Sequence, residues 1–208
     1  MTQYEQRILN RSFLRYLIGL IVRWRANHRY EKVRRIARKR GALIGENVVM
    51  PMELARIANK NLTIGNNVSI QTADIDLRSP VKIGNNVIIG KDVKILTASH
   101  NIDSTEWEFK SYGLEIEDYV WIATNAIIMP SCRKLSYGCV VGGASCVVKN
   151  TTPMEVYGGN PARSLRKRSV VHSNLVVESL LGGDYEHYKE VWKSRRQEQI
   201  SEFNDDTD

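Results

Sequence analysis

The side chain best suited to proton transfer in this sequence is the imidazole of His100. The chain has four histidines, and only His100 falls inside a region of regular repeats. His28 lies in a basic run, and His172 and His187 lie in the C-terminal tail, so these three are expected at the surface. An imidazole titrates near neutral pH and can therefore accept or donate a proton during a reaction. His100 is thus the first candidate for proton transfer.

The three cysteines indicate packing rather than nucleophilic chemistry. Cys132 and Cys139 fall on small, inward positions of the repeat, where a thiol behaves as a small apolar group, whereas the role of Cys146 stays open. An odd number of cysteines with no evident cleavable signal favours a reducing compartment, and the cytoplasm is the expectation. No metal is expected, because a zinc site of the three-histidine kind needs more than the single histidine of the repeat region.

A repeat of six residues must position these side chains. Near copies of one pentapeptide, IGENV, IGNNV and IGNNV, begin at Ile44, Ile64 and Ile83. Aliphatic residues then recur at six-residue spacing in four runs: Ile64 and Ile70; Ile83, Ile89 and Ile95; Ile116, Ile122 and Ile128; Leu135, Val141 and Val147. A small or β-branched residue follows four positions later in nearly every case, and Asp74 is the exception.

This period predicts a mainly β solenoid. It fits neither a helix face nor simple strand alternation. If each six-residue unit forms one side, three sides of about 18 residues close one coil, with Gly and Asn supplying positive-φ corners. The phase breaks twice: one extra residue falls around Arg78-Ser79-Pro80, and the long spacing from Ile95 to Ile116 predicts an inserted loop over 101–115.

Four segments within this region resemble the hexapeptide-repeat acyltransferases. They are TASHNID (97–103), EIEDYVWIATNAIIMP (115–130), VVGGASCVVKN (140–150) and VYGGNPAR (156–163). The similarity covers about residues 44–168 and is greatest to the branch that O-acetylates sugars, which includes galactoside, maltose and nodulation-factor acetyltransferases and enzymes of capsule or O-antigen decoration. The resemblance implies a left-handed parallel β-helix, although the general rule for parallel crossovers favours the opposite hand.

The resemblance also implies roles for individual residues. His100 takes the place of the general base, and Trp121 that of an aromatic residue at the acceptor side of the cleft, although a wall or subunit-contact role for Trp121 stays open. Residues implied to bind coenzyme A are Thr124, Gly143, Val148, Lys149 and Arg163. Two of these, Lys149 and Arg163, carry cations suited to its phosphates. Relatives commonly have a threonine where this chain has Val148, so a hydroxyl contact is lost there.

The implied function is direct transfer of an acetyl group from acetyl-CoA to a sugar hydroxyl, in the making of a surface polysaccharide such as capsule or O-antigen. The implied assembly is a homotrimer with active sites between subunits. An amine acceptor, on an amino sugar or an antibiotic, is the alternative within catalysis. A non-enzymatic scaffold that keeps the fold is a further alternative, against which His100 and the Pro161-Ala162-Arg163 motif both count.

Charge is distributed unevenly along the chain. Residues 1–40 hold twelve basic and two acidic residues, a net charge of +10, whereas the remainder holds 18 basic and 21 acidic residues. Nucleic acid is therefore not an expected partner of the solenoid. We expect three parts: a basic helical segment (1–42), the β-helix (43–168), and a C-terminal tail (169–208) with a helix over 185–203. Residues 7–40 carry an apolar patch and a dense cationic flank, and they either dock on an anionic membrane or cap the solenoid through the patch with solvated arginines. The patch consists of Phe13, Leu14, Leu17, Ile18, Ile21 and Trp24.

Overall fold

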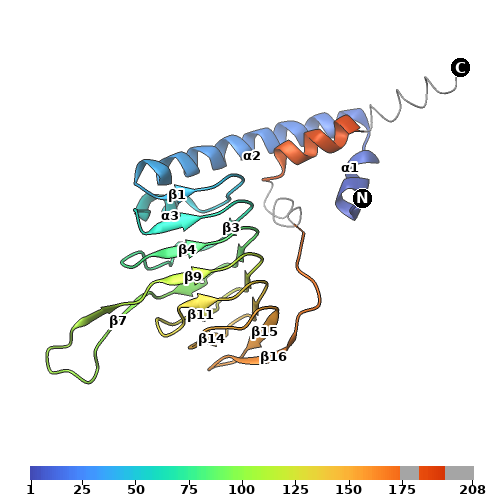
Figure 1. The fold of residues 1–208 in the computed structure, drawn as a ribbon. Coiled ribbons are helices and arrows are strands. Elements are labelled where there is room, and N and C mark those ends of the chain that lie inside the picture. The colour runs from blue at the N-terminus through green and yellow to red at the C-terminus, as the bar shows by residue number, and fades with distance from the viewer. Residues whose placement is uncertain (174–182, 195–208) are drawn as a thin grey trace, which may run out of the picture.

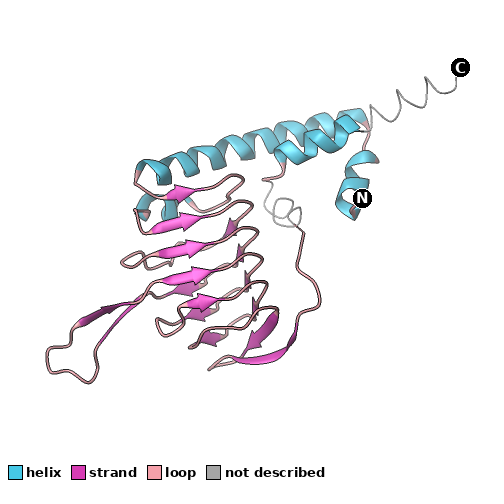
Figure 2. Cartoon of the chain, viewed as in Figure 1, coloured by secondary structure: helices cyan, strands magenta, loops and turns pink. Residues whose placement is uncertain are grey.

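A computed structural model describes residues 1–173 and 183–194 of the chain as a stack of short strands with helices across one end (Figures 1 and 2). The helices are α1 (Gln3–Leu9), α2 (Phe13–Lys39) and α3 (Met52–Ile57), and residues 185–194 are also helical. The rest of the predicted helix over 185–203 lies outside the described residues.

The strands form three sheets of stacked coils and one hairpin. The first sheet contains β1 (Leu43–Ile44), β2 (Leu62–Ile64), β4 (Val81–Ile83), β9 (Leu114–Ile116) and β12 (Lys134–Leu135). The second contains β3 (Ser69–Ile70), β5 (Ile88–Ile89), β10 (Trp121–Ile122), β13 (Val140–Val141), β15 (Glu155–Gly158) and β16 (Arg163–Lys167). The third contains β6 (Lys94–Ile95), β11 (Ile127–Ile128) and β14 (Cys146–Val147). The hairpin pairs β7 (Ala98–His100) with β8 (Phe109–Ser111).

The chain visits the three sheets in turn, and successive turns pair in parallel, apart from the antiparallel closing strand β16. The predicted aliphatic positions stack in register: Ile64, Ile83, Ile116 and Leu135 in the first sheet, and Ile70, Ile89, Ile122 and Val141 in the second. Each of these side chains is buried in one continuous core. The six-residue prediction of a repeat-built, mainly β core is confirmed.

One repeat position shifts from the predicted phase. Asp74 points outward, and Ile75 takes the inward place, where it bridges to Ile95 in the third sheet. The coil that contains β2 and β3, which we call the second coil, therefore has a short side followed by a long corner at Arg78-Ser79-Pro80.

The corners use asparagine and glycine for two different reasons. Asn67 and Asn86 adopt positive φ values of 55° and 56°, as predicted for corner residues. Gly65 does not have positive φ, which corrects the prediction for glycine at this corner. A Cβ at Gly65 would lie 2.7 Å from Asn85 Oδ1 and 2.8 Å from the Gly84 backbone, so glycine is needed for close stacking of coils.

Helix α2 covers the N-terminal end of the stack. Its residues Val33 and Ala37 are buried in the solenoid core, and Ile36 packs against it. The Arg34 guanidinium donates to the Val48 carbonyl at 2.9 Å, and Arg38 donates to the Ile44 carbonyl at 3.0 Å. These bonds occupy acceptors of the first coil, where an edge strand would otherwise be open.

Helix α2 thus caps the solenoid, but not through the predicted residues. The capping residues are Val33, Ile36 and Ala37 rather than the apolar patch nearer the N-terminus. Among the arginines, Arg34 is buried, whereas others such as Arg25 and Arg35 are exposed as predicted. The patch itself is exposed.

The helical residues 185–194 pack beside the N-terminal half of α2 (Figure 1). Tyr16 stacks on Tyr188 and on Trp192, with ring centroids 5.2 and 4.2 Å apart. The Arg23 Nε atom lies 2.8 Å from Asp184 Oδ2, and its guanidinium lies 4.0 Å from the Tyr188 ring centroid. The N- and C-terminal segments thus form a second small core outside the solenoid.

Candidate active site

His100 ends strand β7 of a hairpin that projects from the stack, at the corner between the third and first sheets (Figure 1). Its ring stacks on Trp107 with centroids 5.2 Å apart, and the Phe109 ring meets it edge-on at 5.9 Å. Two aromatic rings therefore fix the plane of the imidazole, although the ring remains exposed.

One hydrogen bond sets the tautomer of His100. Its Nδ1 atom lies 2.8 Å from the Trp107 carbonyl oxygen. A carbonyl only accepts, so Nδ1 carries the hydrogen and donates it. In the neutral ring Nε2 then holds the lone pair, which is the state a general base requires.

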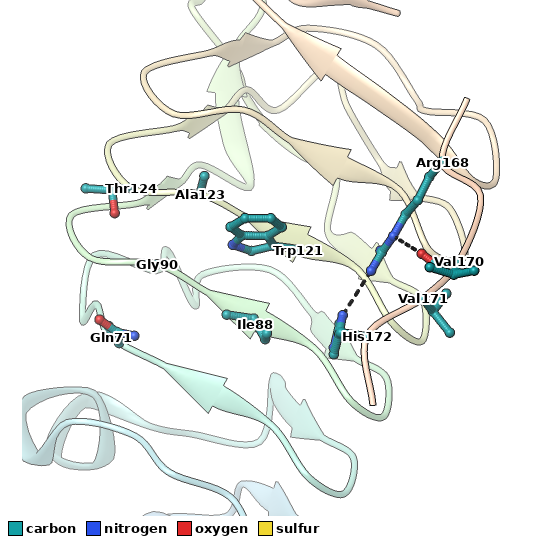
Figure 3. Close-up of a pocket in the computed structure, with 10 residues that line it drawn as sticks. All are labelled: Gln71, Ile88, Gly90, Trp121, Ala123, Thr124, Arg168, Val170, Val171 and His172. Atoms are coloured by element: carbon teal, nitrogen blue, oxygen red, sulfur yellow. Dashed lines mark hydrogen bonds between the residues drawn. The ribbon is translucent and has the colours of Figure 1, made fainter. Parts of the chain in front are cut away.

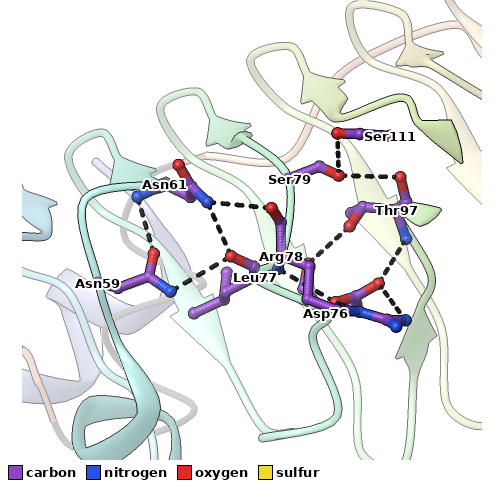
Figure 4. Close-up of polar contacts among 8 residues, drawn as sticks. All are labelled: Asn59, Asn61, Asp76, Leu77, Arg78, Ser79, Thr97 and Ser111. Carbon is purple, nitrogen blue, oxygen red and sulfur yellow. Dashed lines mark hydrogen bonds and ion pairs between the residues drawn. The ribbon is translucent and has the colours of Figure 1, made fainter. Parts of the chain in front are cut away.

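The root of the hairpin is held by the long corner of the second coil (Figure 4). Ser79 Oγ donates to the Thr97 carbonyl at 3.2 Å and lies 2.6 Å from Ser111 Oγ in β8. Asp76 accepts from Arg78 Nε at 2.8 Å and from the Thr97 amide at 3.3 Å. The hydrogen bond from Arg78 is the main cause that lowers the pKa of the Asp76 carboxyl to about 2.

The insertion itself differs in extent from the predicted loop over 101–115. The hairpin pairs Ala98 with Ser111, and Leu114–Ile116 already forms strand β9 of the first sheet. Residues 114 and 115 therefore belong to the coil, because the parallel pairing with β4 resumes there.

Trp121 lies in a cavity of about 500 Å³ on the outer face of the second sheet (Figure 3). It projects from β10 beside Ile88 of β5. Ala123 and Thr124, at the following corner, also line the cavity, and Arg168 and residues 170–172 line its other side. Trp121 and Thr124, two of the predicted site residues, thus share one cavity.

A column of close backbone contacts runs along that corner. A Cβ at Gly90 would lie 2.8 Å from the Thr124 amide nitrogen, and one at Gly143 would lie 3.3 Å from the Thr124 carbonyl oxygen. The Ala144 amide donates to that same carbonyl at 3.0 Å. Thr124 and Gly143 therefore stack on neighbouring coils.

The other residues implied to bind coenzyme A lie elsewhere on the stack. Val148 and the exposed Lys149 follow β14, at the corner between the third and first sheets, and the exposed Arg163 begins β16. The Ala162 amide donates to the Cys146 carbonyl at 2.7 Å, so the turn before Arg163 meets β14. The predicted set surrounds the third sheet rather than filling one cavity of a single chain.

His100 and Trp121 are not brought together within one chain. His100 lies on a hairpin beside the corner between the third and first sheets, whereas Trp121 lies on the outer face of the second sheet. A ligand that touches both must reach across two faces of the solenoid or between two copies.

The strap over 168–172 was not foreseen from the sequence, and the surface prediction for His172 is wrong. The Arg168 guanidinium donates to the Gly138 carbonyl at 2.9 Å and lies 3.1 Å from His172 Nδ1. His172 Nε2 donates to the Asn86 carbonyl at 2.7 Å. Burial, with a contribution from the Arg168 charge, lowers the pKa of His172. The ring is half-buried and fixes the strap against two coils.

The cysteines lie as predicted for packed thiols. Cys132 and Cys139 are buried in the core, and burial raises the pKa of each thiol to about 11. Cys146, on β14, is half-buried. Neither core thiol is suited to nucleophilic attack near neutral pH, because the thiolate is the reactive form.

Residues 1–173 and 183–194 contain neither a cluster of metal-binding side chains nor a membrane-spanning helix. No group of three or more His, Cys, Asp or Glu side chains is arranged to hold a metal ion. In the same part of the chain, no helix has the length and apolar character needed to cross a membrane.

Stacked coils whose sides repeat every six residues give the chain the architecture of a solenoid built from short repeats. No family model matches the sequence. The putative colanic acid biosynthesis acetyltransferase WcaF of Escherichia coli K12 is 28% identical over 151 residues, which cover 72% of this chain and 78% of the relative. The relatives and the solved structures that the chain matches are named as acetyltransferases, and the predicted resemblance is confirmed.

Solved structures agree on the fold. A maltose O-acetyltransferase from Clostridium difficile 630 superposes with a TM-score of 0.54 at 25% identity, over 82% of this chain and 99% of the other. A galactoside acetyltransferase in complex with coenzyme A superposes with a TM-score of 0.51 at 22% identity, over 81% and 84% of the two chains.

Some sequence relatives are matched only in part. The putative acetyltransferase C18B11.09c of Schizosaccharomyces pombe is 33% identical over 93 residues, so the chain spans 43% of that relative's length. It spans 23% of the chloramphenicol acetyltransferase of Escherichia coli.

Proposed function

We propose that the protein transfers an acetyl group from acetyl-CoA to a hydroxyl of a sugar, in the cytoplasm, during the making of a surface polysaccharide such as capsule or O-antigen. The observation that carries the proposal is the His100 imidazole, held by the Trp107 carbonyl with Nε2 as the basic nitrogen. The relative named for colanic acid biosynthesis, matched over most of both chains, supports a glycan acceptor.

The reaction needs no covalent enzyme intermediate. As the acceptor oxygen attacks the thioester carbonyl, His100 Nε2 takes the hydroxyl proton, and the developing charge is shared with the Trp107 carbonyl through Nδ1–H. The tetrahedral oxyanion is stabilised by a backbone N–H. The C–S bond then breaks, and the imidazolium returns its proton to the departing thiolate, so that an ester and coenzyme A are formed.

The donor would lie along the corners that border the third sheet. Thr124 and Gly143 bring backbone groups close to the surface at one corner, because the glycine leaves no side chain over its neighbour. Lys149 and Arg163 are exposed cations suited to the phosphates of coenzyme A, and Val148 offers an apolar contact beside them.

Active sites between subunits would bring Trp121 of one copy to His100 of another. The separation of these residues on one chain supports such a shared site, and we propose a homotrimer. A left-handed β-helix, as the family resemblance implies, is the proposed hand of the coil.

The decisive test compares His100→Ala with His28→Ala, a matched change at an exposed histidine of α2. Release of coenzyme A is measured with hydroxylated sugars, amino sugars and lipid-linked oligosaccharides. His100→Ala should lower turnover about 10²- to 10⁴-fold and leave coenzyme A affinity nearly unchanged, because it removes proton transfer and not donor binding. Unchanged turnover contradicts the role of His100, and faster transfer to amino sugars than to hydroxyls favours N-acetylation.

A further inference from the structure

The exposed side of α2 is apolar over its first turns and cationic over its later turns. Large apolar side chains are exposed along its first three turns: Phe13, Leu14, Leu17, Ile18, Ile21, Val22 and Trp24. All of them are more than a third exposed, and Leu14 reaches 67%. At 3.6 residues per turn these seven positions share about half of the helix circumference. We call them the apolar stripe.

The same side of the helix becomes cationic over its later turns. Exposed basic residues continue the line of the stripe: Arg25, Arg29, Lys32, Arg35 and Lys39. The only acidic residue of α2, Glu31, is engaged by Arg34 and Arg38. Within α2 the stripe and these cations form one continuous face, and the one carboxylate of the helix is already paired.

The opposite side of the helix is already occupied. Tyr16 and Gly19 face the helical residues 185–194, and Val33 and Ala37 face the solenoid. Figure 1 shows α2 along the end of the stack, with the coils on one side of it. The apolar and cationic face is therefore not needed for packing within the described chain, and it lies at an end of the molecule.

We propose that this face docks on an anionic lipid bilayer, with the apolar stripe in the headgroup–acyl boundary and the later turns over the headgroups. An interfacial helix combines an apolar face with flanking basic residues and lies in the plane of the membrane. Charge favours this occupant over a second copy of the chain, because two such faces would bring clusters of cations together. Docking stands apart from the transfer reaction and does not depend on it.

The experiment is sedimentation of the full chain with phosphatidylcholine vesicles that contain about one third phosphatidylglycerol, compared with pure phosphatidylcholine. The wild type should bind the anionic vesicles and lose binding as salt rises. Ile18→Glu with Ile21→Glu should lower partitioning at least tenfold, because two charges would enter the boundary. The control, Leu165→Glu, changes an apolar residue on β16 that is at least as exposed and should bind like the wild type.

The cationic half is tested separately. Arg25→Gln with Arg29→Gln should weaken binding to anionic vesicles by about fivefold for each arginine, whereas Arg166→Gln with Lys167→Gln at the other end of the stack should not. Brominated lipid should quench Trp24 fluorescence, and Trp24→Phe should remove that quenching.

Equal binding of the wild type and the Ile18→Glu, Ile21→Glu variant overturns the proposal, and so does equal binding to neutral and anionic vesicles. If that variant instead changes the oligomeric state in sedimentation velocity without lipid, and the wild type does not bind vesicles, the face is a contact between copies. Thermal unfolding of the variants should match the wild type, since the changed residues are exposed. Acetyl transfer is not measured, so failure here leaves the proposed function untouched.

Discussion

The hydroxyl oxygens of Ser79 and Ser111 lie 2.6 Å apart and join the long corner of the second coil to strand β8 of the hairpin. Ser79 is fully buried and also donates to the Thr97 carbonyl, at the start of the insertion. Both ends of the hairpin are therefore tied to one side chain. The extra corner residues thus serve to hold the hairpin that carries His100.

Ser79→Ala should lower turnover about tenfold while leaving coenzyme A affinity unchanged, because a misplaced base slows proton transfer without altering the donor site. Steady-state kinetics and a coenzyme A binding titration check both quantities. Ser79→Thr, which keeps the hydroxyl, should recover part of the rate, and Ser169→Ala, at an exposed serine, is the control. A loss of stability with unchanged turnover would show that Ser79 supports only the fold.

Asp76 should make the acid stability of the protein depend on one carboxylate. Arg78 and Thr97 lower its pKa from 3.8 to about 2 in the folded chain. The contribution to stability is thus fully present above the unfolded value and is lost as pH falls toward and through 2. Asp76→Asn should flatten the loss of unfolding free energy between about pH 4 and 2, measured by urea titration at each pH. Asp74→Asn, at an exposed carboxylate, should leave the wild-type slope.

Cys132 and Cys139 should resist thiol reagents in the folded chain. Burial raises both pKa values from 9.0 to about 11, so little thiolate is present near neutral pH. Mass spectrometry after brief alkylation should find Cys146 modified first and all three thiols modified in urea. The unfolded chain releases these protons earlier, so stability should fall as pH rises from about 9 to 11. Fast alkylation of Cys139 in the native protein is the contrary result.

Arg34→Met should destabilise the solenoid by about 1–3 kcal/mol, because the Val48 carbonyl would lose its buried donor at 2.9 Å. Methionine keeps much of the apolar stem, so the effect reports the lost hydrogen bond to Val48 together with the lost ion pair to Glu31, and not lost packing. The free energy of unfolding in urea measures it. Arg35→Met, at the exposed neighbour, should change that free energy by less than about 0.5 kcal/mol.

The core could be predicted from the sequence because each coil repeats the same pattern, with an inward-pointing aliphatic residue on each side. Ile83, Ile89 and Ile95 stand six residues apart, and the structure places one on each sheet. The fixed spacing is enough, since a solenoid coil contacts only its neighbours. His100 could be found in the same way, as the histidine at the break in that spacing.

Contacts between distant segments could not be predicted in this way. His172 donates to the Asn86 carbonyl, and Arg34 donates to the Val48 carbonyl. Both acceptors are backbone groups, which every residue has, so no side-chain pattern identifies them. A basic residue in a basic helix and a histidine in a tail are each compatible with full solvation. The distinction depends on where the helix and the strap pass, which no local pattern encodes.

The pairing of neighbouring coils is ambiguous at the level of sequence, because the corner sequences that begin at Ile44, Ile64 and Ile83 are nearly identical. A chain that begins folding at any of them can mispair by a whole coil with little change in buried area. Arg34 and Arg38 fit only the coil that follows α2, and Ser79 fits only the coil that precedes the hairpin. These contacts distinguish coils of similar sequence and so determine which coils pair. Their loss should therefore raise the fraction of mispaired chains after refolding more than it lowers the rate of collapse.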